Sequence, residues 1–247
     1  IDGVEDIAIT TNGVLLSKYA YELKAAGLNR ITVSLDSIDS DEFKLMTGGR
    51  GSLERVLKGI DEAAMAGFKN IKVNAVIKKG VNDKNILKMV EYFRSKSIVL
   101  RFIEYMDVGN INHWQQEETL ASKEIIKMIS ERWPIVPVNE NYQGEVASRY
   151  QFDDGQGEIG FISSVTKPFC SDCTRARLSS DGKLYNCLFA SKGVDLRAWL
   201  EEGMNDDEIE SKIIEIWNQR EDRYSELRLA NKNDPSKEKV EMYYIGG

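Results

Sequence analysis

The first hundred residues repeat one pattern of apolar and polar positions. Short runs rich in β-branched residues, at 6–10, 31–35, 71–77 and 98–103, predict strands. Segments with apolar residues at helical spacing lie between them, at 15–26, 53–66 and 85–95, and Gly27 and Gly67 follow the first two as helix stops. Strands that alternate with helices pair in parallel, so the pattern predicts βαβ units and an α/β fold.

The pattern changes after Gly109. An amphipathic helix at 122–133 is ended by Pro134, and short strand-like segments follow at 147–152, 158–162 and 183–186. Two helices are predicted at 196–202 and 206–218, and charged residues dominate from 219 to 239, where we expect a mobile segment. We therefore expect a parallel α/β unit at 1–109, an α+β region at 110–218 and a charged tail at 219–247 that ends in Gly246 and Gly247.

Composition narrows the class of protein. The 247 residues are 42% hydrophobic, which is enough for a sizeable core, and no apolar run is long enough to span a bilayer. The formal net charge of −7 disfavours a broad surface for nucleic acid or for acidic membranes. The first residues lack the features of a signal peptide, and the cysteines show no sign of disulfide pairing, so we expect a soluble, cytoplasmic protein that binds neither nucleic acid nor membranes.

Polar residues gather where the predicted strands end. Ligands bind at the C-terminal ends of parallel strands, and Thr10 and Ser34 lie at such ends. Lys72 and Arg101 lie inside strand runs, where a charged side chain must either face solvent or reach a site. For any one of these residues, a strand-end turn or a solvated charge is the plainer interpretation.

The three cysteines, Cys170, Cys173 and Cys187, all fall in one short stretch. An odd number excludes complete internal pairing, and a Cys-x-x-Cys pair with a third cysteine favours a metal site. On a 4Fe–4S cluster, three thiolates leave one iron open to a substrate atom. A structural zinc site, completed by His113 or Asp172, and free thiols that bind no metal remain alternatives, so spacing alone leaves the metal open.

Arg175 and Arg177 flank Ala176 directly after Cys173. If 174–178 form a strand, both guanidinium groups lie on one face, which suits a phosphate chain. A solvated, charged strand face is the alternative. The Asp181-Gly182 pair predicts a hairpin that folds Cys187 back toward this segment.

Together these motifs resemble the molybdenum cofactor biosynthesis protein A family of radical S-adenosylmethionine (SAM) enzymes. The similarity covers essentially the whole chain. Its carriers are the runs 10–13, 33–36, 72–74, 80–83 and 101–106, the Cys-x-x-Cys-x-Arg-x-Arg segment with its third cysteine, and the Gly-Gly end.

The resemblance implies a lyase, GTP 3',8-cyclase, that cyclises GTP to 3',8-cyclo-7,8-dihydro-GTP by radical chemistry in the first step of molybdenum cofactor biosynthesis. It implies an auxiliary 4Fe–4S cluster on Cys170, Cys173 and Cys187 that binds GTP. GTP contacts are implied for Thr10, Lys72, Arg175, Ala176 and Arg177, SAM contacts for Ser34 and Met106, and a weaker role for Arg101; Gly246 and Gly247 would reach the active site. A downstream pterin-forming enzyme is the implied partner, and a homodimer is an open expectation.

One departure from the family matters. The family's first cluster, which cleaves SAM, needs a Cys-x-x-x-Cys-x-x-Cys motif, and these 247 residues contain none. Only four parallel strands are predicted where a TIM-like radical SAM barrel needs more, so we expect an incomplete barrel, an N-terminally truncated chain and no SAM cleavage by the chain alone. A radical SAM enzyme whose auxiliary cluster transfers electrons and a zinc-stabilised interaction module remain the competing functions.

Overall fold

The computed structural model describes residues 2–96, 98–170, 173–221, 223–227 and 240–245. The chain divides into two compact units, one made of Ile1–Tyr105 and Gln116–Thr166, the other of Met106–Gln115 and Lys167–Gly247. None of the described helices is long and apolar enough to cross a membrane.

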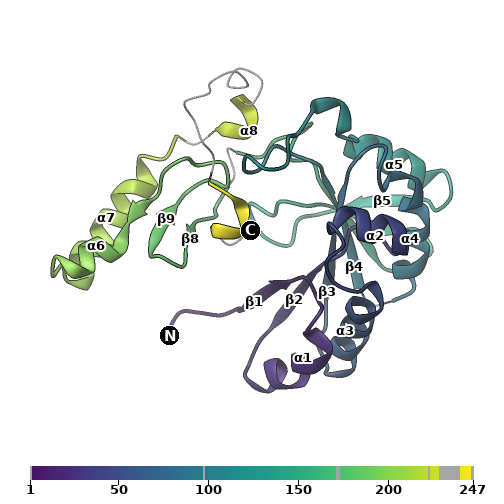
Figure 1. Ribbon diagram of the computed structural model, residues 1–247, viewed down its shortest axis with the longest axis horizontal. Helices are drawn as coiled ribbons and strands as arrows, with labels where there is room; N and C mark the ends of the chain where they lie inside the picture. The colour runs from purple at the N-terminus through teal and green to yellow at the C-terminus, as the bar shows by residue number, and fades with distance from the viewer. Residues whose placement is uncertain (1, 97, 171–172, 222, 228–239, 246–247) are drawn as a thin grey trace. The chain divides into compact units, whose positions relative to one another are not determined.

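In the described part of the first unit, seven strands form one sheet (Figure 1). They are β1 (Ala8–Thr11), β2 (Arg30–Ser34), β3 (Ile71–Ile77), β4 (Ile98–Glu104), β5 (Ile135–Val138), β6 (Ser148–Phe152) and β7 (Glu158–Ile162), and their spatial order is β1-β2-β3-β4-β7-β6-β5. β1 to β4 and β7 pair in parallel, whereas β5 and β6 are antiparallel additions. The molecule is therefore a mixed α/β protein with a mainly parallel sheet, as predicted.

Helices cover one face of this sheet, as Figure 1 shows. They are α1 (Leu16–Ala25), α2 (Ser40–Met46), α3 (Leu53–Met65), α4 (Ile86–Arg94) and α5 (Ser122–Ser130), with 3-10 turns η1 (Asp83–Asn85) and η2 (Gln116–Glu118). α1 and α3 end before Gly27 and Gly67, whose positive φ angles of 93° and 86° supply the left-handed stop that glycine favours. The two predicted helix ends are thus confirmed.

The core lies between the helices and the sheet. Alternate residues of β3 and β4 are buried, since successive side chains of a strand point to opposite faces. The largest fully buried side chains include Phe93, Phe102 and Phe161, and Phe102 and Phe161 on neighbouring strands lie 6.2 Å apart by ring centroids. The buried face of β3 and β4 is therefore used for packing, and Lys72, Asn74 and Arg101 lie on the opposite face.

The placement of the segments after residue 130 corrects one expectation. The sequence predicts that the strand-like segments at 147–152 and 158–162 belong to a C-terminal α+β region, but β6 and β7 extend the sheet of the first unit. β7 pairs in parallel with β4 because α5 and the β5–β6 hairpin return the chain to the same edge. The large sheet therefore extends past residue 109, where the sequence predicts the end of the parallel α/β unit.

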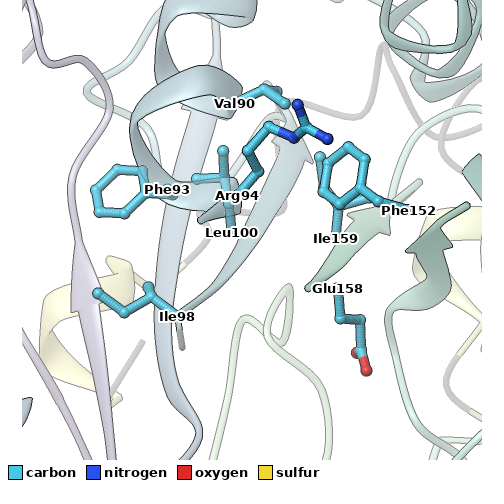
Figure 2. Close-up of a pocket in the computed structure, with 8 residues that line it drawn as sticks. All are labelled: Val90, Phe93, Arg94, Ile98, Leu100, Phe152, Glu158 and Ile159. Atoms are coloured by element: carbon cyan, nitrogen blue, oxygen red, sulfur yellow. The ribbon is translucent and has the colours of Figure 1, made fainter. Parts of the chain in front are cut away.

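A small depression between α4 and the added strands is filled by the protein itself (Figure 2). Arg94 extends over it, with its guanidinium carbon 5.1 Å from the centroid of Phe152 and 5.0 Å from that of Trp133, and it pairs with Asp154. Stacking between a guanidinium group and aromatic rings joins the helix to the strands. The Arg94 side chain therefore packs α4 against β6 and Trp133 at this depression.

Glu104, at the end of β4, is fully buried. It lies just before residues 106–115, which belong to the second unit and interrupt the first unit in sequence. Its Oε1 accepts hydrogen bonds from the Ser122 amide (2.8 Å) and the Thr166 hydroxyl (2.6 Å), and its Oε2 accepts from the amides of Val165 (2.9 Å) and Thr166 (2.8 Å). A buried carboxylate is tolerated when hydrogen-bond donors replace water, and here four do so. One side chain thereby ties β4 to α5 and to the segment after β7.

The second unit contains a smaller sheet. Among its described residues, β8 (Arg177–Leu178), β9 (Lys183–Tyr185) and β10 (Val194–Asp195) pair in the order β10-β9-β8, followed by α6 (Leu196–Glu201), α7 (Asp206–Asn218), α8 (Tyr224–Leu227) and η3 (Met242–Tyr244). Asn205 and Glu208 form a capping box that starts α7. The predicted helices are confirmed, and α8 lies inside the expected charged tail, of which 228–239 are outside the described residues.

Candidate functional site

The face of the large sheet opposite the helices carries polar side chains from neighbouring strands. Thr10 pairs with Thr32, which pairs with Lys72, so these three form one row across β1, β2 and β3. Paired residues of parallel strands point to the same face, and strand alternation places this row opposite the buried residues of β2 and β3. Two predicted site residues, Thr10 and Lys72, are therefore brought onto one face.

A second row runs beside the first. Ser34 pairs with Asn74, Asn74 with Arg101, and Arg101 with Gly160. The row continues to Arg149 of β6, which pairs with Gly160. The structure thus brings together four of the predicted residues, Thr10, Ser34, Lys72 and Arg101, although they span more than ninety positions of sequence.

Lys72 is a half-buried cation on this face, where the nearby carboxylates of Glu145 and Glu158 act on it more weakly than burial and the neighbouring cations do. Burial lowers the pKa of its ammonium group, and the neighbouring cations Arg101 and Arg30 lower it further. Among the described residues, Lys72 has no hydrogen-bond or ion-pair partner, whereas Arg30 is held by Asp6 and Arg149 by Glu158, with Nε to Oε1 at 2.9 Å. A half-buried cation beside other cations is stabilised by an anion, so this face is suited to bind one.

Neighbouring residues set the direction of the Arg101 side chain. Its Nε donates a 2.8 Å hydrogen bond to Asn74 Oδ1, and its aliphatic stem lies over Gly160. A Cβ atom at residue 160 would lie only 3.0 Å from Cγ of Arg101 and 3.5 Å from Cβ of Ala147. The absence of a side chain at Gly160 therefore leaves the space that the arginine stem occupies.

A buried amide joins the ends of β2 and β3. Asn82 is 1% exposed, and its Nδ2 donates to the carbonyl oxygens of Asp36 and Val76, both at 2.8 Å, while its Oδ1 accepts from the Lys78 amide at 2.8 Å. The Asp36 carboxyl in turn accepts from the Val76 amide at 2.9 Å. These bonds fix the strand ends that flank Ser34 and Asn74.

Asp36 makes stability depend on pH. Burial raises its pKa to about 6, although the hydrogen bond from the Val76 amide opposes the shift. The unfolded value is about 3.9, so the folded chain binds more protons between these values and loses stability as pH rises from about 4 to about 6. In Asp36→Asn the amide oxygen still accepts from Val76, and we expect this variant to exceed wild type by roughly 2 kcal/mol in free energy of unfolding at pH 7.5.

The measurement is urea unfolding of both proteins at pH 4.5 and pH 7.5. The gain should shrink at the lower pH, where wild-type Asp36 is mostly protonated. An equal difference between the variant and wild type at both pH values would show that the Asp36 carboxyl does not titrate as described.

The cysteine segment lies in the second unit. The Cys173 amide donates to the Cys170 carbonyl at 3.4 Å, which forms a turn, and the Cys187 sulfur accepts from the Phe189 amide at 3.5 Å. All three thiols are free and half-buried. Within the part of the chain that the structure describes, no three His, Cys, Asp or Glu side chains converge closely enough to hold a metal ion.

The chemistry of the cysteines nevertheless fits thiolate ligands. Burial alone raises the pKa of Cys173, but hydrogen bonds from Arg220 and Arg175 outweigh it and hold that pKa below its ordinary value. Arg175 Nε lies 3.2 Å from the Cys173 sulfur. Burial and Arg175 lower the pKa of Arg177, while the thiols of Cys187 and Cys173 raise it, so both thiols lie within electrostatic range of one guanidinium group. Thiolate character is what an iron–sulfur cluster requires of its ligands.

The predicted hairpin around Asp181 and Gly182 is confirmed, because β8 and β9 pair through Arg177 and Tyr185. The strand is shorter than predicted, since β8 contains only Arg177 and Leu178. Arg175 and Ala176 are exposed and precede it. Strand alternation therefore does not place Arg175 and Arg177 on one face. Both guanidinium groups instead lie near Cys173.

Arg220 was missed by the sequence analysis. Its Nη1 donates a 2.8 Å hydrogen bond to the Cys173 carbonyl from 47 residues away. It follows α7 and stacks on Trp217, with its guanidinium carbon 5.0 Å from that ring. No sequence pattern marks it, because it stands in a charged stretch at the start of the expected tail.

Met106 lies on the 106–115 loop of the second unit. Its carbonyl accepts from the Val108 amide at 3.0 Å and from Asn112 Nδ2 at 2.9 Å. Tyr224 connects this loop to the cysteine segment: its hydroxyl donates to Asp107 at 3.0 Å, and its ring stacks on Phe189 at 4.5 Å. The predicted residues Gly246 and Gly247 lie outside the described residues.

Comparisons with known proteins agree with these features. The family model described as Radical SAM superfamily matches residues 1–93, and Molybdenum Cofactor Synthesis C matches residues 98–226. A GTP 3',8-cyclase of Xanthomonas campestris pv. campestris (strain 8004) is 49% identical over 247 residues, which are 100% of this chain and 72% of the relative. GTP 3',8-cyclases of Staphylococcus haemolyticus (46% over 249 residues; 100% of this chain, 73% of the relative) and Acidothermus cellulolyticus (44% over 267 residues; 99% and 74%) are also similar. The chain therefore belongs to the GTP 3',8-cyclase family within the radical SAM superfamily.

Proposed function

We propose that this chain carries the GTP-binding part of a GTP 3',8-cyclase, which forms 3',8-cyclo-7,8-dihydro-GTP in the first step of molybdenum cofactor biosynthesis. The observation that carries the proposal is Lys72, a half-buried ammonium group with no partner among the described residues and with Arg101 and Arg30 beside it. The relatives' names identify the substrate as GTP, whose triphosphate is a polyanion.

In this proposal, the GTP contacts are Thr10, Lys72, Arg175, Ala176 and Arg177. The ammonium group and the two guanidinium groups neutralise phosphate oxygens, and a planar guanidinium group can bind two oxygens at once. The Thr10 hydroxyl is exposed in the same row as Lys72, where it can hydrogen-bond a polar part of the ligand.

The proposed metal ligands are Cys170, Cys173 and Cys187. A 4Fe–4S cluster on three thiolates supplies, when bound, one iron with an open coordination position for a GTP atom. Arg175 and Arg220 donate to Cys173 and favour its deprotonated form. Ser34 and Met106 are the proposed SAM contacts: the Ser34 hydroxyl donates a hydrogen bond, and the Met106 thioether packs against an apolar face. Arg101 is the weaker candidate, as an anion contact for either GTP or SAM.

The proposal extends to the whole enzyme. The parallel sheet is part of a TIM-like radical SAM barrel, Gly246 and Gly247 reach the active site, and the enzyme is a cytoplasmic lyase. A pterin-forming enzyme consumes its product, and a homodimer is its proposed assembly.

The test is GTP binding by the chain after reconstitution with iron and sulfide without oxygen. We expect matched iron and sulfide, a broad visible absorption that shifts on adding GTP, and binding that weakens by about 10- to 100-fold in Lys72→Met, since a charge-assisted bond is lost. Lys69→Met, which removes an exposed charge just before β3, is the matched control and should bind as wild type.

Other outcomes would favour the competing functions. Equal GTP affinity of Lys72→Met and wild type would contradict the proposed phosphate contact. Zinc in the purified protein, together with unchanged nucleotide binding in Arg175→Ala, would favour a zinc-stabilised interaction module. An iron–sulfur cluster without GTP binding would favour a radical enzyme whose cluster transfers electrons.

The chain alone is expected not to cleave SAM. Cleavage by this family needs the SAM-cleaving cluster, and the three cysteines of these 247 residues are all assigned to the auxiliary cluster. Incubation of the reconstituted chain with SAM and a strong reductant should yield no 5'-deoxyadenosine above a protein-free control. Stoichiometric or greater formation of 5'-deoxyadenosine would contradict this expectation.

A further inference from the structure

The second unit contains a contact between two segments far apart in sequence. The Asn110 amide, on the loop that begins with Met106, donates a 2.7 Å hydrogen bond to Oε1 of Glu241. The two residues are 131 positions apart, and Glu241 directly precedes η3. A carboxylate that accepts a backbone amide is a charge-assisted bond and is stronger than a neutral one.

The backbone conformation of Gly109 and its lack of a side chain both permit this contact. Its φ angle is +66°, a conformation that glycine adopts without strain. A Cβ atom there would overlap Oε2 of Glu241 and lie 2.7 Å from its Cδ. A side chain at residue 109 would therefore displace the Glu241 carboxylate from its present position.

Other contacts hold the rest of residues 240–245. The Val240 amide donates to the Ala190 carbonyl at 3.4 Å, close to Cys187, and Ile245 is only 1% exposed. A hydrogen bond to Asp181, in the β8–β9 turn, raises the pKa of Tyr244. The segment thus contacts the cysteine region, the hairpin turn and the 106–115 loop, and Glu241 provides its charged contact with that loop.

We propose that Glu241 is a positioning residue that docks the C-terminal segment onto the loop bearing Met106. The docked segment sets where the chain that follows Ile245 can reach. This inference rests on the proposed function, in which Gly246 and Gly247 approach bound GTP, but the docking itself is a property of residues 109, 110 and 240–245.

Hydrogen–deuterium exchange of the whole chain tests the docking without any activity. In Glu241→Ala, we expect exchange in peptides covering 107–112 and 240–245 to rise by about 10- to 100-fold, because the Asn110 amide loses a charged acceptor. Gly109→Ala should produce the same pattern from the other side of the contact. Glu241→Gln keeps an oxygen that can accept from Asn110, so it should restore much of the protection.

Gly203→Ala is the matched control. Gly203 also belongs to the second unit and has φ +84°, but a Cβ atom there meets nothing within 4 Å, so this variant adds backbone strain without disturbing a contact. It should leave exchange in both peptides at the wild-type rate. Thermal unfolding of every variant separates a local loss of protection from a general loss of fold.

GTP titration of the same reconstituted proteins separates this inference from the proposed function. Wild-type exchange in Glu241→Ala would overturn the docking role, even if wild type binds GTP. Raised exchange in Glu241→Ala and in Gly109→Ala, in a chain that binds no GTP, would support the docking and contradict the proposed function. If both hold, Glu241→Gln should match wild type in GTP affinity more closely than Glu241→Ala does.

Discussion

Replacing Cys187 with serine is expected to remove essentially all iron that the reconstituted chain retains. The proposed cluster has only three protein ligands, and a hydroxyl is a much weaker ligand for iron than a thiolate. Cys170→Ser and Cys173→Ser should have the same effect, because each removes one third of the protein ligand set. Iron and sulfide content after gel filtration, with the visible spectrum, measures the result.

Ser191→Ala provides the control for this prediction. It removes an exposed hydroxyl four residues after Cys187 and should retain iron as wild type does. The three serine variants should keep the wild-type far-ultraviolet circular dichroism of the metal-free chain, since the thiols are half-buried and not in the core. Wild-type iron content in Cys187→Ser would exclude this residue as a ligand.

Glu104→Gln is expected to lower the free energy of unfolding by about 2–4 kcal/mol. Each carboxylate oxygen accepts two hydrogen bonds, from three amides and one hydroxyl. The glutamine amide group is a donor, so it would face two of these donors and leave them buried and unsatisfied. Removing the charge of a fully satisfied, buried acceptor therefore costs much more than removing a surface charge.

Urea unfolding and thermal unfolding measure this effect, and a loss of this size corresponds to roughly 4–16 °C in midpoint for a domain of this length. Glu22→Gln makes the same change on the exposed surface of α1 and should alter stability by less than about 0.5 kcal/mol. A change in Glu104→Gln no larger than that of Glu22→Gln would show that the four hydrogen bonds do not carry the expected energy.

The first hundred residues were predictable because local signals agreed with each other. The predicted strands at 31–35, 71–77 and 98–103 correspond to β2, β3 and β4, and the predicted helices at 15–26, 53–66 and 85–95 to α1, α3 and α4. The pairing of these strands followed from helices that return the chain in the same direction. The shared face of Thr10, Ser34, Lys72 and Arg101 was not predicted, because it depends on the register in which the parallel strands pair.

The rest depends on contacts between distant parts of the sequence. The helix α2, of seven residues, was not predicted because its apolar pattern is too short to identify. β6 and β7 carry no local sign of which sheet they join. Arg220 and Glu241 were missed for the same reason: each acts on a backbone group more than forty residues away.

Gly160, an uncharged residue, influences the direction of the Arg101 side chain. The direction of Arg101 is set on one side by Asn74 and on the other by the space that a missing methyl group leaves open. A side chain at residue 160 would compete with the aliphatic stem of Arg101 for the space that it occupies, while the charge of the arginine stays the same. The position of a cation on this sheet thus depends on the volume of an uncharged neighbour, so a substitution at residue 160 can move Arg101 without replacing it.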